Sequence, residues 1–238
     1  MVPPTWVLLT VVLAAGGAQP PDPASVAQLE AEGRDAEALA AADALVRDQP
    51  GWELPRLDAA RLRLKLGEDL GRAEGDLLTA QAIAPENPRG HFLMGLLHEE
   101  RSREDRAREA RAVESYRTAL VYRPHYDEAR SRLAGLLYAR GELEAAEREY
   151  RILSERQPDE LGPRLQLASV LERMGRDEEA ERILLALWES DRRPVVAGRR
   201  LLALYERTEQ REKAKRLRAV IEGPAPQKQH RPLKPSRR

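Results

Sequence analysis

The chain has 238 residues, of which 42% are hydrophobic and only 4% aromatic, so any core must be made of small and aliphatic side chains, which favours an all-α protein. Lys and Arg together number 40, as do Asp and Glu, so the formal net charge is zero. Five of the basic residues lie in the stretch 224–238, which has no acidic residue, so the rest of the chain has a net charge of about −5. This charge argues against a nucleic-acid partner. The absence of cysteine excludes disulfides, thiolate metal ligands and a cysteine nucleophile.

The chain begins with an uncharged apolar segment. Trp6–Ala15 reads WVLLTVVLAA and precedes Gly16, Gly17 and Ala18, the layout of a secretory signal cleaved after Ala18. A helix of about 20 Å is short of the roughly 30 Å hydrocarbon core, so residues 1–18 are predicted to be a signal peptide, with a short membrane anchor as the alternative. We therefore expect an exported, periplasmic protein. Because Met1–Pro4 holds no Lys or Arg, a cytoplasmic protein is the further alternative.

The rest of the chain repeats at an interval of 34 residues. Leu133 is followed by Leu167 and Leu201, and Ala146 by Ala180. An alanine also lies twelve residues before each of five prolines; these alanines are Ala38, Ala73, Ala112, Ala146 and Ala214. An interval of this length is typical of stacked supersecondary units, so the sequence predicts repeated helix pairs.

The recurring residue types have physical roles in such a pair. An alanine at a fixed point of the second helix lets the two helices approach closely, and a larger side chain one turn on, such as Tyr116 or Tyr150, fills the remaining space. Proline breaks the chain where the next pair starts. Gly33, Gly141 and Gly175 are predicted to end first helices in the left-handed conformation.

The residues that recur at equivalent positions of the repeats, here called columns, resemble those of the tetratricopeptide repeat family. The 34-residue helix-turn-helix units of that family stack into a right-handed superhelix. The segments YARGELEAAEREYRILSERQP (138–158) and LERMGRDEEAERILLALWESD (171–191) carry the resemblance. It implies an all-α, right-handed solenoid of about six repeats over residues 19–227. The approximate repeats are 19–53, 54–87, 88–126, 127–160, 161–194 and 195–227. The Arg-rich, Lys-poor composition favours a bacterial source.

Three repeats depart from this pattern. In 88–126 a surplus of five residues lies in the charged stretch 101–111, read as a solvated protrusion or, alternatively, as a contact for a partner. In 54–87 the register is ambiguous, because Leu57, Ala60 and Leu64 form an apolar face that puts Arg61 where a small residue belongs. In 195–227 Glu209 or Gln210 replaces the glycine and Arg218 occupies a normally apolar column, as expected of a terminal repeat.

The resemblance also implies a binding surface. Proteins of this family commonly hold an extended or helical peptide in a concave groove lined by their first helices. Register places twelve residues of this chain there: Phe92, Leu96, Glu99, Ser131, Arg132, Gly135, Tyr138, Leu165, Ser169, Arg173, Arg199 and Arg200. Aromatic and aliphatic side chains among arginines favour an amphipathic peptide bearing acidic groups, while the alternative is that half of these residues only cover the inner wall.

The function predicted is therefore a non-catalytic scaffold that binds a protein or peptide partner, with no cofactor and no catalytic residue. The first alternative is a structural or self-associating component of an envelope assembly, and the oligomeric state is left open. The second is a metal-dependent enzyme using His91 and His98, which lie seven residues apart on one helix, although a packing role is favoured for both. The basic tail 228–238 is predicted to be disordered, with weak attachment to an anionic surface as its functional alternative.

Overall fold

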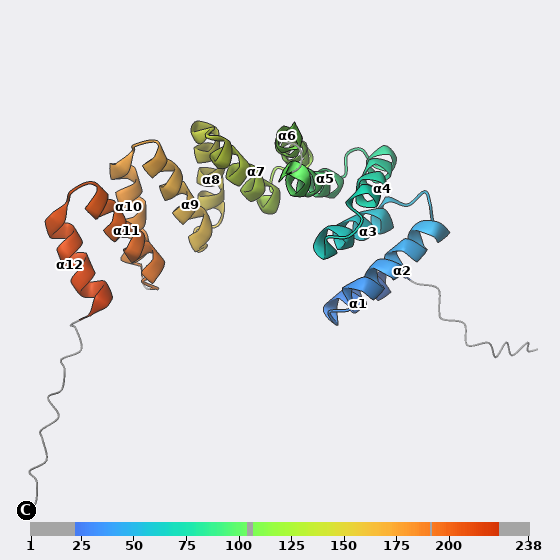
Figure 1. Cartoon of the computed structure of the whole chain (residues 1–238), viewed down its shortest axis with the longest axis horizontal. Coiled ribbons are helices and arrows are strands. Elements are labelled where there is room, and N and C mark those ends of the chain that lie inside the picture. The colour runs from blue at the N-terminus through green and yellow to red at the C-terminus, as the bar shows by residue number, and fades with distance from the viewer. Residues whose placement is uncertain (1–21, 104–106, 191, 224–238) are drawn as a thin grey trace, which may run out of the picture. The chain divides into compact units, whose positions relative to one another are not determined.

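A computed structural model describes residues 22–103, 107–190 and 192–223, so the expected signal or anchor (1–18) and the basic tail (228–238) lie outside the described residues. The described residues form twelve α-helices and one short 3-10 helix, with no strand among them (Figure 1). None of these helices is both long and apolar enough to cross a membrane. The expected all-α repeat fold is confirmed, and it is built as two compact units, Met1–Pro85 and Glu86–Arg238.

The first unit contains two helix pairs. Its helices are α1 (Pro23–Ala31), α2 (Asp35–Asp48), α3 (Glu53–Leu66) and α4 (Leu70–Ile83). Each helix packs against the next in chain order. Asp22 begins the first pair, because its carboxylate accepts a hydrogen bond from the Ser25 backbone nitrogen at 2.7 Å and Pro23 follows at the first helical position.

The second unit contains four helix pairs and the 3-10 turn. Its elements are α5 (Pro88–Glu100), η1 (Arg101–Arg103), α6 (Ala107–Tyr122), α7 (Asp127–Arg140), α8 (Leu143–Arg156), α9 (Leu161–Arg173), α10 (Asp177–Trp188), α11 (Val195–Arg207) and α12 (Arg211–Glu222). Consecutive helices again pack against each other, so within this unit each pair stacks on the pair before it. Because each pair covers the apolar side of its neighbour, the core is shared along the unit.

The alanine column predicted from the sequence lies in the cores. Ala38, Ala73, Ala112, Ala146 and Ala180 are fully buried, and Ala214 in the last helix is 7% exposed. Tyr116 and Tyr150, one turn further along their helices, are also buried. The close helix approach inferred from the small side chain is therefore confirmed in both units.

The predicted helix ends are confirmed as well. Gly33, Gly141 and Gly175 have φ angles of 74°, 81° and 75°, the left-handed conformation in which a side chain would be strained. In the last repeat Glu209 adopts the same conformation with φ 57°, so it is Glu209 and not Gln210 that replaces the glycine. Arg218 is exposed and pairs with Glu206, as a terminal repeat allows.

The structure settles the register of the second repeat. Ala60 is fully buried and takes the small-residue position, which Arg61 would occupy if the spacing of the other repeats held here. The physical reason is one additional residue in the turn: Gly67 ends α3 and Asp69 caps α4, whereas Gly141 and a single glutamate separate α7 from α8. Arg61 instead donates to both carboxylate oxygens of Glu30 and ties α3 to α1.

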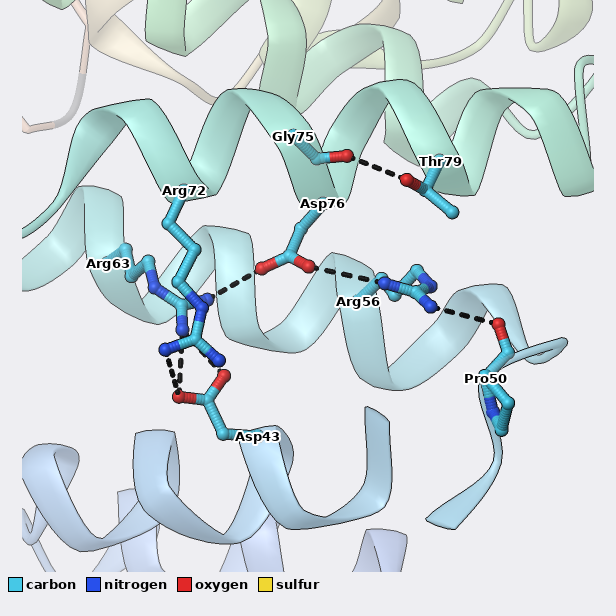
Figure 2. A network of polar contacts seen from close by, with 8 residues as sticks. All are labelled: Asp43, Pro50, Arg56, Arg63, Arg72, Gly75, Asp76 and Thr79. Carbon is cyan, nitrogen blue, oxygen red and sulfur yellow. Dashed lines mark hydrogen bonds and ion pairs between the residues drawn. The ribbon is translucent and has the colours of Figure 1, made fainter. Parts of the chain in front are cut away.

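This register puts an arginine inside the first unit. Arg63 is 2% exposed and pairs with Asp43 of α2 and Asp76 of α4, as Figure 2 shows. The corresponding residues of the later repeats are Leu137 and Leu171, both buried. An ion pair that joins three helices thus replaces an apolar contact in this repeat.

The described part of the surplus stretch in 88–126 forms a turn and the start of a helix. After α5 the chain forms η1, and α6 then begins at Ala107, five residues before Ala112. The equivalent helix α8 begins only three residues before Ala146. Within the stretch 101–111, residues 101–103 form the 3-10 turn and residues 107–111 lengthen the start of α6, while residues 104–106 lie outside the described residues.

Candidate partner-binding face

The predicted groove residues lie on four first helices of the second unit, α5, α7, α9 and α11. Phe92, Leu96 and Glu99 show the spacing: they are separated by four and three residues, which places them on one side of α5. We call the surface formed by the twelve predicted residues the inner face.

An aromatic cluster occupies the α5 end of the inner face. The Phe92 ring lies 4.9 Å from that of Tyr126 and 5.8 Å from that of Tyr116, measured between centroids. Leu96 is half-buried and packs against the same core. Gly95 makes room for this arrangement, since a Cβ atom there would lie 2.5 Å from a Tyr116 ring carbon. The aromatic surface is therefore held by close contact between α5 and α6.

Glu99 joins three helices. Its Oε2 accepts a hydrogen bond from the Tyr116 hydroxyl at 2.7 Å, and its Oε1 accepts one from Arg132 Nη1 of α7 at 3.3 Å. Burial raises the pKa of Tyr116, and the adjacent Glu99 carboxylate raises it further, so the hydroxyl remains a donor. The Arg132 side chain is 54% exposed, so this ion pair contributes little stability by itself.

A second arginine connects α9 to α7. Arg173 donates from Nη1 to the backbone carbonyl of Tyr138 at 2.6 Å. Its guanidinium carbon also lies 4.9 Å from the centroid of the Tyr138 ring, in a cation–π contact. The arginine therefore satisfies a carbonyl near the end of α7 and covers the aromatic ring.

A third arginine connects α11 to α9. Arg200 donates from Nη1 to the carbonyl of Leu165 at 2.9 Å, and its other terminal nitrogen bonds to the Ser169 hydroxyl. Glu172 lies 3.6 Å from the same nitrogen. Arg132 joins α7 to α5, Arg173 joins α9 to α7, and Arg200 joins α11 to α9. Together these contacts connect the four first helices of the second unit into one continuous surface.

Part of the inner face is exposed to solvent. Ser131, Arg132, Arg173 and Arg199 are exposed, and Arg199 makes no hydrogen bond or ion pair with the described residues. Phe92, Tyr138 and Leu165 are half-buried, so they present apolar area while packing on the core. At Gly135 a Cβ atom would come no closer than 3.6 Å to the Tyr150 hydroxyl, which leaves a shallow notch there. The surface thus has half-buried apolar side chains on α5, α7 and α9 and, on α11, one arginine without an ion pair among the described residues.

Comparison with known proteins agrees with this architecture. Residues 104–162, which span α6 to α8, match the model of the tetratricopeptide repeat family. Residues 104–162 therefore contain tetratricopeptide repeat sequence. No curated protein sequence matches it significantly.

Solved structures share the fold of these tetratricopeptide repeats. A thermophilic repeat protein from Thermus thermophilus is 21% identical, with a TM-score of 0.55, and the match covers 75% of this chain and 94% of that chain. A repeat protein from Parabacteroides merdae is 18% identical with a TM-score of 0.64, over 85% and 78% of the two chains. YrrB, described as a repeat protein with an unusual peptide-binding site, is 17% identical with a TM-score of 0.63, over 76% and 92%.

Sequence reasoning missed one charged residue of the inner face. Glu172 pairs at 3.6 Å with Arg200 and at 3.8 Å with Arg207, so it belongs to the link between α9 and α11. The signal was present in the repeat itself, because Glu172 lies 34 residues after Tyr138 and hence in the same column. Extending each predicted column through all the tetratricopeptide repeats would have found it.

The two histidines considered as metal ligands lie in packing positions of the third tetratricopeptide repeat. The His91 ring stacks on that of Tyr122 at 5.5 Å. His98 is 8% exposed, and its Nδ1 lies 3.5 Å from Arg108 Nη1. Among the described residues no group of three or more His, Cys, Asp or Glu is arranged to hold a metal ion. Their surroundings are those of side chains that fill space between helices.

Proposed function

We propose that the protein is a non-catalytic scaffold whose inner face binds a peptide segment of a protein partner. One observation carries the proposal: arginine contacts from α7, α9 and α11 join four first helices into one surface that presents half-buried apolar side chains. A surface of this kind suits peptide recognition, because fixed apolar anchors supply buried area without a large cost in side-chain ordering.

The charges of the inner face suggest the chemistry of that peptide. Arg132, Arg173 and Arg200 already have partners within the chain, while Arg199 has none among the described residues. Arginine pairs readily with carboxylates, so a segment with apolar side chains and an acidic group near Arg199 fits best. YrrB, which shares the fold, is described as having a peptide-binding site, and this likeness supports the proposed class of ligand.

Affinity capture with two matched double variants tests the proposal. Phe92→Ala/Tyr138→Ala removes aromatic anchors from the inner face. Ile152→Ala/Val220→Ala removes exposed apolar side chains from the second helices α8 and α12, where Ile152 is 37% and Val220 59% exposed. The first variant should lose a partner recovered by the wild-type protein, and the second should retain it. Unchanged recovery with Phe92→Ala/Tyr138→Ala would contradict the proposal.

Charge reversal provides a second test that leaves the packing alone. Arg199→Glu changes an exposed side chain that has no partner in the described part of the chain. It should weaken binding of the acidic partner while leaving the circular dichroism spectrum and the melting temperature unchanged. If Arg199→Glu binds the partner as tightly as the wild type does, the partner has no acidic group near Arg199. This conclusion stands even if the Phe92→Ala/Tyr138→Ala result supports the apolar contacts.

A further inference from the structure

One arginine position recurs near the start of several first helices and always lies beside a proline turn. In α7 it is Arg130, which donates from Nη2 to the carbonyl of Pro124 at 2.6 Å. Its other terminal nitrogen pairs with Glu149 of α8, and the arginine side chain is only 11% exposed. The position thus holds a nearly buried guanidinium that is matched by a carboxylate from the second helix of the same pair.

The first unit repeats this arrangement in α3. Arg56 donates from Nη2 to the carbonyl of Pro50 at 2.9 Å, and its Nη1 lies 3.4 Å from Oδ1 of Asp76 in α4 (Figure 2). Asp76 occupies the same place on its helix as Glu149 does on α8, three residues after the column alanine. In two independent cases, therefore, the partner of this arginine is a carboxylate.

The third instance lacks that carboxylate. Arg164 of α9 lies 34 residues after Arg130, but the residue 34 after Glu149 is Ile183. Arg164 is half-buried and makes no hydrogen bond or ion pair with the described residues. Burial without a partner is unfavourable for a charged group, and Arg164 lacks both the proline-carbonyl bond and the carboxylate that Arg56 and Arg130 have. Asp159 and Glu160 border the far side of its turn without pairing with it.

Arg164 borders a hollow on the side of α8, α9 and α10. The hollow has a volume of about 380 Å³, and its apolar lining includes Leu167, Leu171 and Ile183. The counterpart around Arg130 is of the same volume, and there Glu149 is part of the lining. The two hollows therefore differ in whether the chain supplies its own carboxylate.

The remaining charges of the hollow favour an anion. Arg151 is paired with Glu147, and Glu179 with Arg176, so neither is available. The exposed Arg182 makes no ion pair with described residues, nor does the exposed Glu155 at the rim. The lining thus holds two arginines, Arg164 and Arg182, and one carboxylate, Glu155, that have no ion pair among the described residues.

We propose that this hollow is a second docking site, separate from the inner face, for a peptide segment that supplies a carboxylate to Arg164 and an aliphatic side chain to the floor formed by Leu167 and Ile183. The peptide carboxylate takes the place that Glu149 takes beside Arg130. Charge-assisted hydrogen bonds from a planar guanidinium favour this geometry, and the apolar floor excludes water from it. The hollow and the inner face share no residue, so the two sites can be tested independently.

The test uses two blocked peptides and the full chain labelled with ¹⁵N. The probe is acetyl-Ala-Leu-Glu-Leu-Ala-amide, and the control peptide carries Gln in place of Glu. The Glu peptide should shift the Arg164 Nε–H resonance in a saturable manner, and the Gln peptide should bind at least about tenfold more weakly, as the loss of a charge-assisted hydrogen bond requires. Equal affinity of the two peptides, or no shift at Arg164, overturns the proposal.

Substitutions at Ile183 supply the matched controls. Ile183→Glu installs the carboxylate that the fourth repeat already has, so it should pair with Arg164 and abolish binding of the Glu peptide. Ile183→Gln has nearly the same shape without the charge and should retain more binding; equal loss in both variants contradicts the role of the carboxylate. Arg164→Gln should make the protein bind the Glu peptide and the Gln peptide equally well. This variant is an independent test in case Ile183→Glu does not fold. A retained preference in Arg164→Gln overturns the assignment of Arg164.

Discussion

Arg63 donates a hydrogen bond from Nη1 to Oδ2 of Asp76 at 2.7 Å in the interior of the first unit, where the arginine is 2% exposed (Figure 2). Its Nη2 donates to both oxygens of Asp43, at 2.6 and 2.8 Å. Burial raises the pKa of Asp76, and Arg63 and Arg56 offset only part of this effect. The network therefore has a desolvation cost, which its charges compensate only while all of them are present.

Removing Arg63 should be strongly destabilising for this reason. Arg63→Ala leaves Asp76 and Asp43 without their central partner and opens a cavity between α2, α3 and α4. We expect the free energy of unfolding of the first unit to fall by about 3–5 kcal/mol. Hydrogen exchange of peptides covering α2–α4, measured by mass spectrometry, gives the local value. The control is Arg47→Ala, since Arg47 is exposed and makes no ion pair with described residues; it should stay within about 0.5 kcal/mol of wild type. Equal effects of the two substitutions would contradict a structural role for the buried charge.

The helix pairs themselves were predictable because burial recurs at a constant interval. Ala146 and Ala180 lie 34 residues apart and both are fully buried, so a column of small residues indicated where helices approach. The register of the second repeat was not predictable in this way. Leu57, Ala60 and Leu64 form an apolar face under either register, and one additional residue in a turn leaves no trace in a hydrophobic pattern. An arginine in a sequence is normally predicted to be exposed to solvent. The burial of Arg63 depends on Asp43 and Asp76, which lie on two other helices, and the sequence alone does not pair them with it.

The inner face was predictable as a set of positions but not as a set of contacts. Register placed Tyr138 and Arg173 on first helices, and the structure has them in α7 and α9. The bond from Arg173 to the Tyr138 carbonyl depends on how far apart α7 and α9 lie, and no residue type signals a backbone acceptor. The same holds for Arg200 and the Leu165 carbonyl. Arginines that a sequence assigns to a ligand can therefore be engaged within the fold.

Two glycines on adjacent first helices should respond to alanine in opposite directions. A Cβ atom on Gly95 would lie 2.5 Å from a ring carbon of Tyr116, which is fully buried and cannot move aside. Gly95→Ala should therefore lower the free energy of unfolding by about 1–3 kcal/mol, as overpacking does. On Gly135 the nearest atom, the Tyr150 hydroxyl, lies at 3.6 Å, so Gly135→Ala should gain up to about 1 kcal/mol from helix propensity. Urea denaturation of both variants measures the change in the free energy of unfolding. A decrease for Gly135→Ala would show that there is no space for a Cβ atom at Gly135.

The first unit should lose stability at acid pH through Glu30. A side-chain hydrogen bond from Arg61, with Nη1 at 2.6 Å, holds the pKa of Glu30 below its usual 4.5, against the opposing effect of burial. Because the folded-state pKa is the lower one, this stabilisation is complete above about pH 4.5 and is lost as the pH falls through the folded-state value. Urea denaturation between pH 6 and pH 3 should show a steeper decline for wild type than for Glu30→Gln. Arg61→Gln should remove the same part of the pH dependence. Parallel profiles for all three proteins would exclude the pair as its source.

The turn of the last repeat offers a stabilising substitution. Glu209 has φ 57°, in the left-handed conformation that glycine supplies in the equivalent turns at Gly141 and Gly175. The strain of a side chain in this conformation costs roughly 1–2 kcal/mol, and Glu209→Gly removes it. Glycine also raises the conformational entropy of the unfolded chain, which offsets part of the stabilisation. A net increase of about 0.5–1 kcal/mol in the free energy of unfolding is expected from urea denaturation. Gln210 has φ −79° and its side chain donates to Glu181, so Gln210→Gly should instead be destabilising. If Gln210→Gly stabilised the protein and Glu209→Gly did not, the turn would have its left-handed residue one position later than the structure places it.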